Sequence, residues 1–194
     1  MTTFVLATAN PHKTGEMSAV LAALGIAVLP RPADVPDVDE TEDTLEGNAL
    51  LKARALVEAT GHAAVADDTG LFVDALGGAP GVFSARYAGE PANDAANVDK
   101  LLAVLAEVPV DERGAQFRTV IAVAYPDGTS LCVEGVLEGS IGFERRGEGG
   151  FGYDPIFLPA AGAGRTLAEY SADEKNASSH RALALHALAK ALSL

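Results

Sequence analysis

The sequence predicts one α/β domain over residues 1–194, with helices on a central mixed β-sheet. Apolar, β-rich runs alternate with segments of helical spacing in the first half of the chain, and a β-rich block occupies the middle. This alternation is typical of α/β folds. The chain has 194 residues, 48% of them hydrophobic, which is enough for one sizeable core. We expect a cleft between the N-terminal part and the part that carries Phe151 and the closing helix.

The first strand is predicted over Thr3–Ala7, and the spacing of apolar residues predicts a helix over Lys13–Leu24. The turn between them, Thr8–Lys13, contains Pro11, which suits a first helical turn. Free N–H groups at the start of the helix, together with the charge of Lys13, would hold an anion. Taken alone, these residues are explained better by an asparagine cap on a surface helix.

An acidic, proline-rich stretch follows the short strand predicted over Ile26–Leu29. We expect a solvated loop over Arg31–Glu46, from which a carboxylate near Glu40 could reach a metal. Thr44 then caps a long helix that runs from Leu45 to about Thr60.

Two adjacent aspartates follow the apolar run His62–Ala66, which predicts a short buried strand. Successive strand residues point to opposite faces, so Asp67 and Asp68 cannot face solvent together unless the chain turns. We expect Thr69-Gly70 to make that turn, ahead of the glycine- and proline-rich segment Gly77–Gly81. A solvated turn and a metal and phosphate site explain these residues equally well.

The remaining elements are a helix, three strands and a closing helix. They are predicted over Asn93–Leu105, Gln116–Tyr125, Leu131–Leu137, Gly139–Phe143 and Asp173–Leu192.

The composition argues against several partners. The formal charge of −13 repels nucleic acid and anionic membranes. A phosphate ligand therefore needs local cations or Mg²⁺. Cys132, the only cysteine, lies in an apolar run and is expected to be a reduced core residue. No signal-type segment and no stretch long enough to span a bilayer is present, so we expect a cytoplasmic protein.

Five segments in order carry a family resemblance. They are Thr8–Lys13, Glu40 through Ala53, Ala66–Leu71, Gly150–Phe157 and Glu174–Arg181. With Gly77–Gly81 and Ser84–Tyr87, they closely resemble the inosine/xanthosine triphosphate pyrophosphatases, also called Ham1-like. The resemblance covers nearly the whole chain. One departure is Gly47-Asn48, where the family usually has Glu-Asn, and this puts any role of that glutamate in doubt.

The resemblance implies an elongated, two-lobed homodimer that hydrolyses purine nucleoside triphosphates with Mg²⁺. Deaminated purines (ITP, dITP and XTP) are the implied substrates, and the monophosphate and pyrophosphate are the implied products. The role would be to cleanse the nucleotide pool.

The resemblance also implies roles for individual residues. Asp68 would be the general base, and Glu40 and Asp68 would bind Mg²⁺, which takes only one or two carboxylates. The expected substrate-binding residues are Thr8, Ala9, Asn10, Pro11, His12, Lys13, Lys52, Thr69, Phe151, Gly152, Tyr153, Asp154, Lys175, His180 and Arg181. Lysines would meet the phosphates, whereas Phe151, Asp154, His180 and Arg181 would select the base. A buried core role is the alternative for Phe151, and Arg86 is expected near the phosphates or at the subunit interface.

Two other functions remain open. The pocket would serve a purine nucleotide-binding regulator that does not hydrolyse its ligand, although simple binding needs no base. A pyrophosphatase for modified pyrimidine nucleotides would share the fold class.

Overall fold

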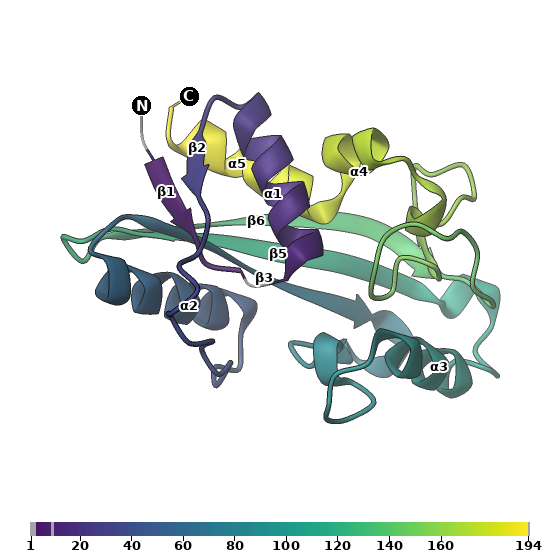
Figure 1. Ribbon diagram of the computed structural model, residues 1–194. Coiled ribbons are helices and arrows are strands. Elements are labelled where there is room, and N and C mark those ends of the chain that lie inside the picture. Colours follow the sequence, from purple (N-terminus) through teal and green to yellow (C-terminus); the bar gives the residue numbers. More distant parts are fainter. Residues whose placement is uncertain (1–2, 9, 194) are drawn as a thin grey trace. The chain divides into compact units, whose positions relative to one another are not determined.

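The computed structural model describes residues 3–8 and 10–193 (Figure 1). The strands found in them are β1 (Thr3–Leu6), β2 (Ala27–Leu29), β3 (Ala64–Val73), β4 (Pro80–Gly81), β5 (Gly114–Ala124), β6 (Ser130–Ile141) and β7 (Phe157–Pro159). The α-helices are α1 (Pro11–Ala23), α2 (Leu45–Thr60), α3 (Asp94–Val104), α4 (Ala172–Ser178) and α5 (His180–Ala191).

All of these strands belong to one sheet, in the order β2-β1-β3-β5-β6-β7, with β4 paired to β3. The strand β1 is parallel to both β2 and β3, whereas β3 with β4 and β6 with β7 are antiparallel. The sheet is therefore mixed, and the predicted α/β class is confirmed. None of the helices in the described part of the chain is long and apolar enough to cross a bilayer.

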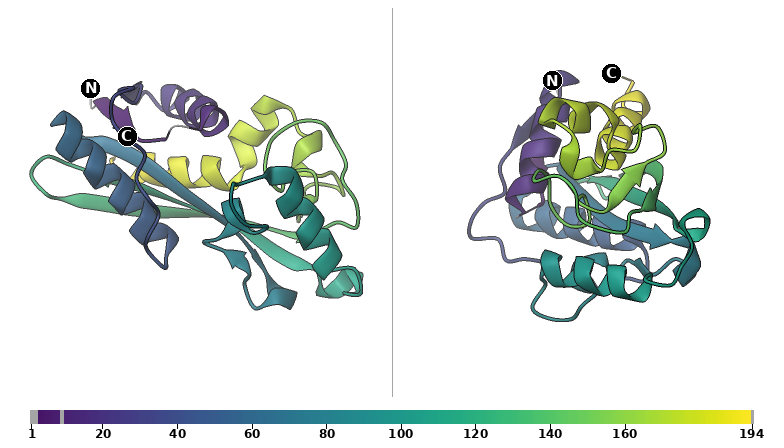
Figure 2. Two further views of the ribbon diagram at one scale, coloured as in Figure 1. Left: turned by 60° about the horizontal axis from the view of Figure 1, so that its bottom comes forward. Right: turned by 90° about the vertical axis from the view of Figure 1, so that its right-hand side faces the viewer.

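The chain divides into two compact units. The first comprises Met1–Asp68, Thr119–Gly135 and Asn176–Leu194, and the second comprises Thr69–Arg118 and Val136–Lys175. In the first unit, α1 and α5 cover one face of the strands and α2 covers the other (Figures 1 and 2). Val65 of β3 packs there in one apolar cluster with Met17 of α1 and Leu188 of α5.

The second unit has its own apolar cluster. Leu71 and Val73, at the end of β3, pack in it with Leu101 of α3 and with Ile156 and Phe157. Each unit therefore has a core on which its functional side chains can be fixed.

The predicted helix ends are largely confirmed. The Asn10 side chain caps α1 by accepting from the N–H groups of His12 (2.9 Å) and Lys13 (3.3 Å). Thr44 caps α2 by accepting from the N–H of Gly47 at 3.0 Å. Gly61 closes that helix in the left-handed conformation, with a φ of 69°.

The predicted turn at Thr69-Gly70 is wrong, because β3 continues through both aspartates to Val73. Asp67 and Asp68 need no common solvent face, since each is buried and has cationic partners on its own side of the strand. Instead of forming a turn, Gly70 lets the backbone of β4 lie close to β3. A Cβ there would lie 2.6 Å from the carbonyl oxygen of Gly81 in β4.

The predicted closing helix is interrupted at Ser179, which separates α4 from α5. Ser179 is extended (φ −69°, ψ 161°), and its side chain caps α5 by accepting from the N–H of Ala182. Leu183, in the predicted closing helix, is exposed. The two strands predicted over 131–143 are the single strand β6. Cys132 in that strand is half-buried, not a core residue.

Candidate active site

The turn before α1 is organised by Asn10. Its backbone N–H donates to the Thr8 hydroxyl at 3.2 Å, and its side chain takes up two N–H groups of the helix. The asparagine cap is therefore real. Lys13, one turn into the helix, points its ammonium group to Asp67, with 3.0 Å between Nζ and Oδ2. Pro11 and His12 are exposed, and Ala9 lies outside the described residues.

Asp67 is held by cations from two helices. Besides Lys13 of α1, Arg181 of α5 donates to Oδ2 of Asp67 from Nε (3.3 Å) and Nη2 (3.2 Å). Arg181 also pairs with Glu16 of α1. Burial alone would raise the pKa of Asp67, but Lys13, Arg181 and Lys52 outweigh it and hold that pKa well below its usual range. Asp67 is therefore a fixed anion.

Asp68 faces α2 and has a different environment. Lys52 donates to Oδ1 of Asp68 at 3.1 Å and to Oε1 of Glu40 at 2.9 Å. Burial raises the pKa of Asp68, and the Glu40 carboxylate adds to the rise against the effect of Lys52. Burial would lower the pKa of Lys52, but Asp68, Asp67 and Glu40 together raise it. Asp68 is thus poised to take up a proton, whereas Asp67 is not.

The segment that carries Glu40 is fixed by a buried amide. Asn48 of α2 is fully buried. It accepts from the backbone N–H of Glu42 at 3.0 Å and donates to the Glu42 carbonyl at 3.2 Å. Gly47 leaves room for the Glu42 side chain, because a Cβ there would lie 2.7 Å from Cβ of Glu42. The glycine found in place of the family's glutamate therefore fits this chain's own loop.

Glu40 and Asp68 suit a hard divalent cation. Within the described residues, Oδ2 of Asp68 is buried and has no hydrogen-bond partner. No cluster of three or more His, Cys, Asp or Glu side chains able to hold a metal is found in that part of the chain. Mg²⁺ does not require one, since it binds through one or two carboxylates, waters and substrate phosphates. The two carboxylates therefore fit Mg²⁺ better than a metal with an all-protein ligand set.

In the second unit, Asp154 organises the segment around Phe151. Its Oδ2 accepts from the Phe151 N–H at 2.9 Å and from Lys175 Nζ at 2.7 Å. The same Nζ lies 5.1 Å from the centroid of the Phe151 ring. Gly150 (φ +74°) is required here, because a Cβ would lie 2.1 Å from Oδ2 of Asp154. The backbone of Phe151 is thus fixed by Asp154, and its half-buried ring faces the ammonium group of Lys175.

The residues beside Phe151 have structural partners. The Tyr153 hydroxyl donates to the Ser84 carbonyl at 2.8 Å, and burial raises its pKa. The N–H of Gly152 donates to Asp94 of α3 at 2.9 Å. Arg86 lies over the ring of Phe83, with 5.4 Å from Cζ to the centroid.

His180 is buried at the start of α5. Its Nδ1 lies 2.6 Å from the hydroxyl of Thr119, which is fully buried in β5. Thr69 is half-buried in β3, directly after Asp68.

The structure therefore brings the predicted residues together in two groups. In the first unit these are Lys13 and Arg181 with Asp67, and Lys52 and Glu40 with Asp68. In the second they are Phe151, Asp154 and Lys175. Sequence reasoning missed Glu16, Asp94 and Thr119. Helical spacing offered a signal for Glu16, three residues after Lys13 on the same side of α1, but nothing local marked the other two.

Comparison with known proteins identifies the family of this chain. A family model described as the Ham1 family matches residues 4–191. A Streptomyces coelicolor protein named dITP/XTP pyrophosphatase is 53% identical over 192 residues, covering 97% of this chain and 96% of that protein. A Bacillus subtilis protein of the same name is 45% identical, covering 97% and 96%. A solved structure of a HAM1 protein from Coxiella burnetii matches with a TM-score of 0.89 and 44% identity, covering 100% and 99% of the two chains. The chain belongs to the Ham1 family.

Proposed function

We propose that this protein hydrolyses the triphosphates of deaminated purine nucleosides, namely ITP, dITP and XTP, to the monophosphate and pyrophosphate. The observation that carries the proposal is the contrast between the adjacent aspartates. Both are buried, but Asp67 pairs with Lys13 and Arg181, whereas Asp68 shares Lys52 with Glu40 and burial raises its pKa. A general base works best when its pKa lies toward the working pH, so this environment favours Asp68 over Asp67 for that role. The names of the relatives from Streptomyces coelicolor and Bacillus subtilis support the substrate class.

In the proposed reaction, Asp68 accepts the proton of the water that attacks phosphorus. Lys13 and Lys52 offset the charge of the phosphates, and Asp67 keeps Lys13 in place. Glu40 and Asp68 would hold Mg²⁺, which supplies further charge neutralisation and acidifies bound water. The Thr8–Lys13 turn and Thr69 complete the proposed phosphate-binding set.

The base would be recognised by Phe151 and by the start of α5. We propose that Phe151 stacks on the purine, held by Asp154 and Lys175. His180 would donate a hydrogen bond to the 6-oxo group, which adenine replaces with a 6-amino donor. Two donors that face each other go unpaired, and a buried site rejects such a ligand by large factors.

We further propose one catalytic domain over residues 1–194 that assembles as a homodimer in the cytoplasm. The relatives' coverage of nearly the whole chain supports the single domain. Sedimentation analysis of the purified protein tests the dimer.

A product-resolved assay tests the activity. The protein is incubated with ITP, XTP, GTP, ATP and dUTP, with and without Mg²⁺, and pyrophosphate is separated from orthophosphate. We expect pyrophosphate from ITP and XTP, dependent on Mg²⁺. Asp68→Asn should abolish turnover without loss of fold, whereas Asp127→Asn, an exposed turn position, is the matched control.

Three outcomes contradict the proposal. Turnover that survives both EDTA and loss of Asp68 overturns the mechanism. Tight ITP binding without products favours the regulator. Preference for dUTP favours the pyrimidine enzyme.

A further inference from the structure

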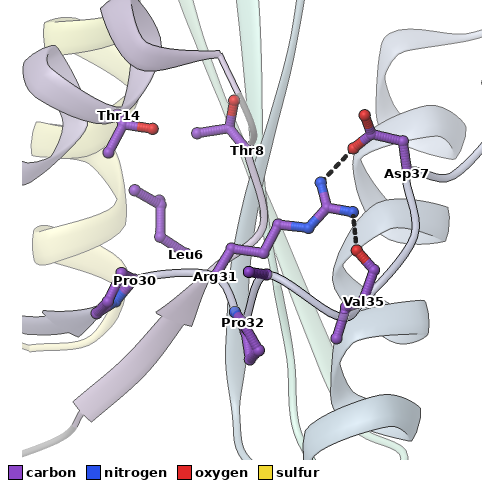
Figure 3. Close-up of a pocket in the computed structure, with 9 residues that line it drawn as sticks. Leu6, Thr8, Thr14, Pro30, Arg31, Pro32, Val35 and Asp37 are labelled. Carbon is purple, nitrogen blue, oxygen red and sulfur yellow. Dashed lines mark hydrogen bonds and ion pairs between the residues drawn. The ribbon is translucent and has the colours of Figure 1, made fainter.

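A cavity of about 390 Å³ lies beside the turn that begins α1 (Figure 3). One wall comes from β1 and α1 and carries the side chains of Thr8 and Thr14. The other wall is the loop after β2, with Arg31, Val35 and Asp37. The cavity therefore combines hydroxyls and a guanidinium group with apolar surface.

Both threonine hydroxyls are tied to the turn proposed to hold phosphates. The Thr8 hydroxyl accepts from the Asn10 N–H at 3.2 Å. The Thr14 hydroxyl donates to the Asn10 carbonyl at 3.0 Å. Thr8 belongs to the turn and to the cavity wall, so a ligand bound in the cavity contacts the turn directly.

Arg31 is positioned inside the cavity but is weakly neutralised. Its guanidinium donates to the Val35 carbonyl at 2.9 Å and pairs with the Asp37 carboxylate (Figure 3). The Arg31 side chain is 13% exposed, whereas that of Asp37 is 77% exposed. An ion pair with one partner in solvent contributes little. An anion can therefore replace Asp37 at small cost, while Val35 still orients the guanidinium.

The other cations of the candidate active site in this unit pair with buried carboxylates, unlike Arg31, whose partner is exposed. Lys13 and Arg181 share the buried carboxylate of Asp67, and Lys52 contacts Asp68. A nucleoside triphosphate carries its highest charge at the terminal phosphate. On a protein with a formal charge of −13, a further local cation is needed there.

We propose that this cavity binds the terminal phosphate of the nucleoside triphosphate, and the pyrophosphate after hydrolysis, with Arg31 as the binding cation. The inference rests on the proposed function and names a subsite for it. The planar guanidinium fork pairs with two phosphate oxygens at once, which makes arginine suited to this task. Arg31 would then favour triphosphates over shorter chains and hold pyrophosphate after the bond is broken.

Calorimetric titration with inorganic pyrophosphate tests the subsite. In Mg²⁺ buffer, Arg31→Gln should weaken pyrophosphate binding about tenfold, as expected for loss of charge-assisted hydrogen bonds. Arg31→Lys keeps the charge without the guanidinium fork, so its affinity for pyrophosphate should lie between those of the unmodified protein and Arg31→Gln. Asp37→Asn removes the competing carboxylate and should bind pyrophosphate at least as tightly as the unmodified protein.

The two variants Arg31→Gln and Asp37→Asn also separate binding from loop support, because both break the same ion pair. If Arg31 only fixes the loop, both variants lose pyrophosphate affinity alike, and the inference is overturned. Unchanged affinity of Arg31→Gln overturns it as well. Should Arg31→Gln fail to fold, Arg31→Lys and Asp37→Asn still decide, because only Arg31→Lys should lose pyrophosphate affinity.

A failure of the proposed function can be told apart from a failure of the pyrophosphate subsite. If the unmodified protein releases no pyrophosphate from ITP, the function fails, whereas the titration still reports on the cavity. With turnover present, Arg31→Gln should raise the KM for ITP about tenfold and change that for IDP less.

Discussion

Replacing Asp67 with asparagine should destabilise the protein strongly. Asparagine keeps the shape but leaves Arg181, whose side chain is 2% exposed, without this carboxylate. Breaking a buried ion pair from one side costs about 3–5 kcal/mol. Arg181 keeps Glu16 and Lys13 reaches solvent, so we take the lower end, about 3 kcal/mol. For a chain of this length, that corresponds to a Tm lower by about 6–12 °C.

The pH dependence of this loss follows from the direction of the pKa shift. The folded pKa of Asp67 is lowered, so its ionised form contributes stability above the unfolded pKa. That contribution disappears as the pH falls below about 4, toward the folded value. Urea denaturation at pH 7 and in steps below pH 5 should show a large gap between the two proteins that narrows with acidification.

The neighbouring position supplies the matched control. Burial raises the folded pKa of Asp68, so the folded state disfavours its charge. Asp68→Asn should therefore unfold at neutral pH with a free energy no lower than that of the unmodified protein. The reasoning is refuted if Asp67→Asn is as stable as the unmodified protein at pH 7. It is also refuted if Asp68→Asn loses as much unfolding free energy as Asp67→Asn.

Three further substitutions test the support of the site. Asn48→Ala should cost about 1–3 kcal/mol in urea unfolding, because the backbone of Glu42 loses both partners. It should also weaken Mn²⁺ binding to the substrate-free protein, measured by electron paramagnetic resonance; unaltered Mn²⁺ affinity speaks against the role of this amide. Gly47→Ala should cost about 1–3 kcal/mol, since its Cβ meets Glu42, and an unchanged urea midpoint contradicts this. Asp154→Ala removes the carboxylate paired with the buried ammonium of Lys175 and should lower the unfolding free energy by about 3 kcal/mol, a loss that thermal unfolding would detect or exclude.

The sequence was sufficient to predict the ends of a helix where neighbouring residues cap it. The predicted start of α2 at Leu45 and its end near Thr60 are confirmed, because Thr44 offers a capping hydroxyl and Gly61 adopts a positive φ at little cost. The break before α5 carried a similar signal in Ser179, but the helical spacing on both sides concealed it.

Distant partners explain what the sequence could not predict. The turn expected at Thr69-Gly70 rested on turn-forming residues, but β3 runs on, and its buried aspartates pair with cations from α1, α2 and α5. Arg181 lies 114 residues from Asp67, and no local pattern indicates that pairing. The candidate phosphate and metal residues followed from family resemblance, whereas their charge balance required the structure.

The alternation of strand residues, which led to the wrong turn, also explains the chemistry of the site. Because neighbours point to opposite faces, one strand can place two adjacent carboxylates in separate environments. Asp67 shares the face of Val65, which packs with α1 and α5, and those helices supply Lys13 and Arg181. Asp68 faces α2, where a single lysine is shared with a second carboxylate. One aspartate is thereby fixed as an anion and the other is left able to accept a proton, so a continuous strand separates the two roles better than a solvated turn would.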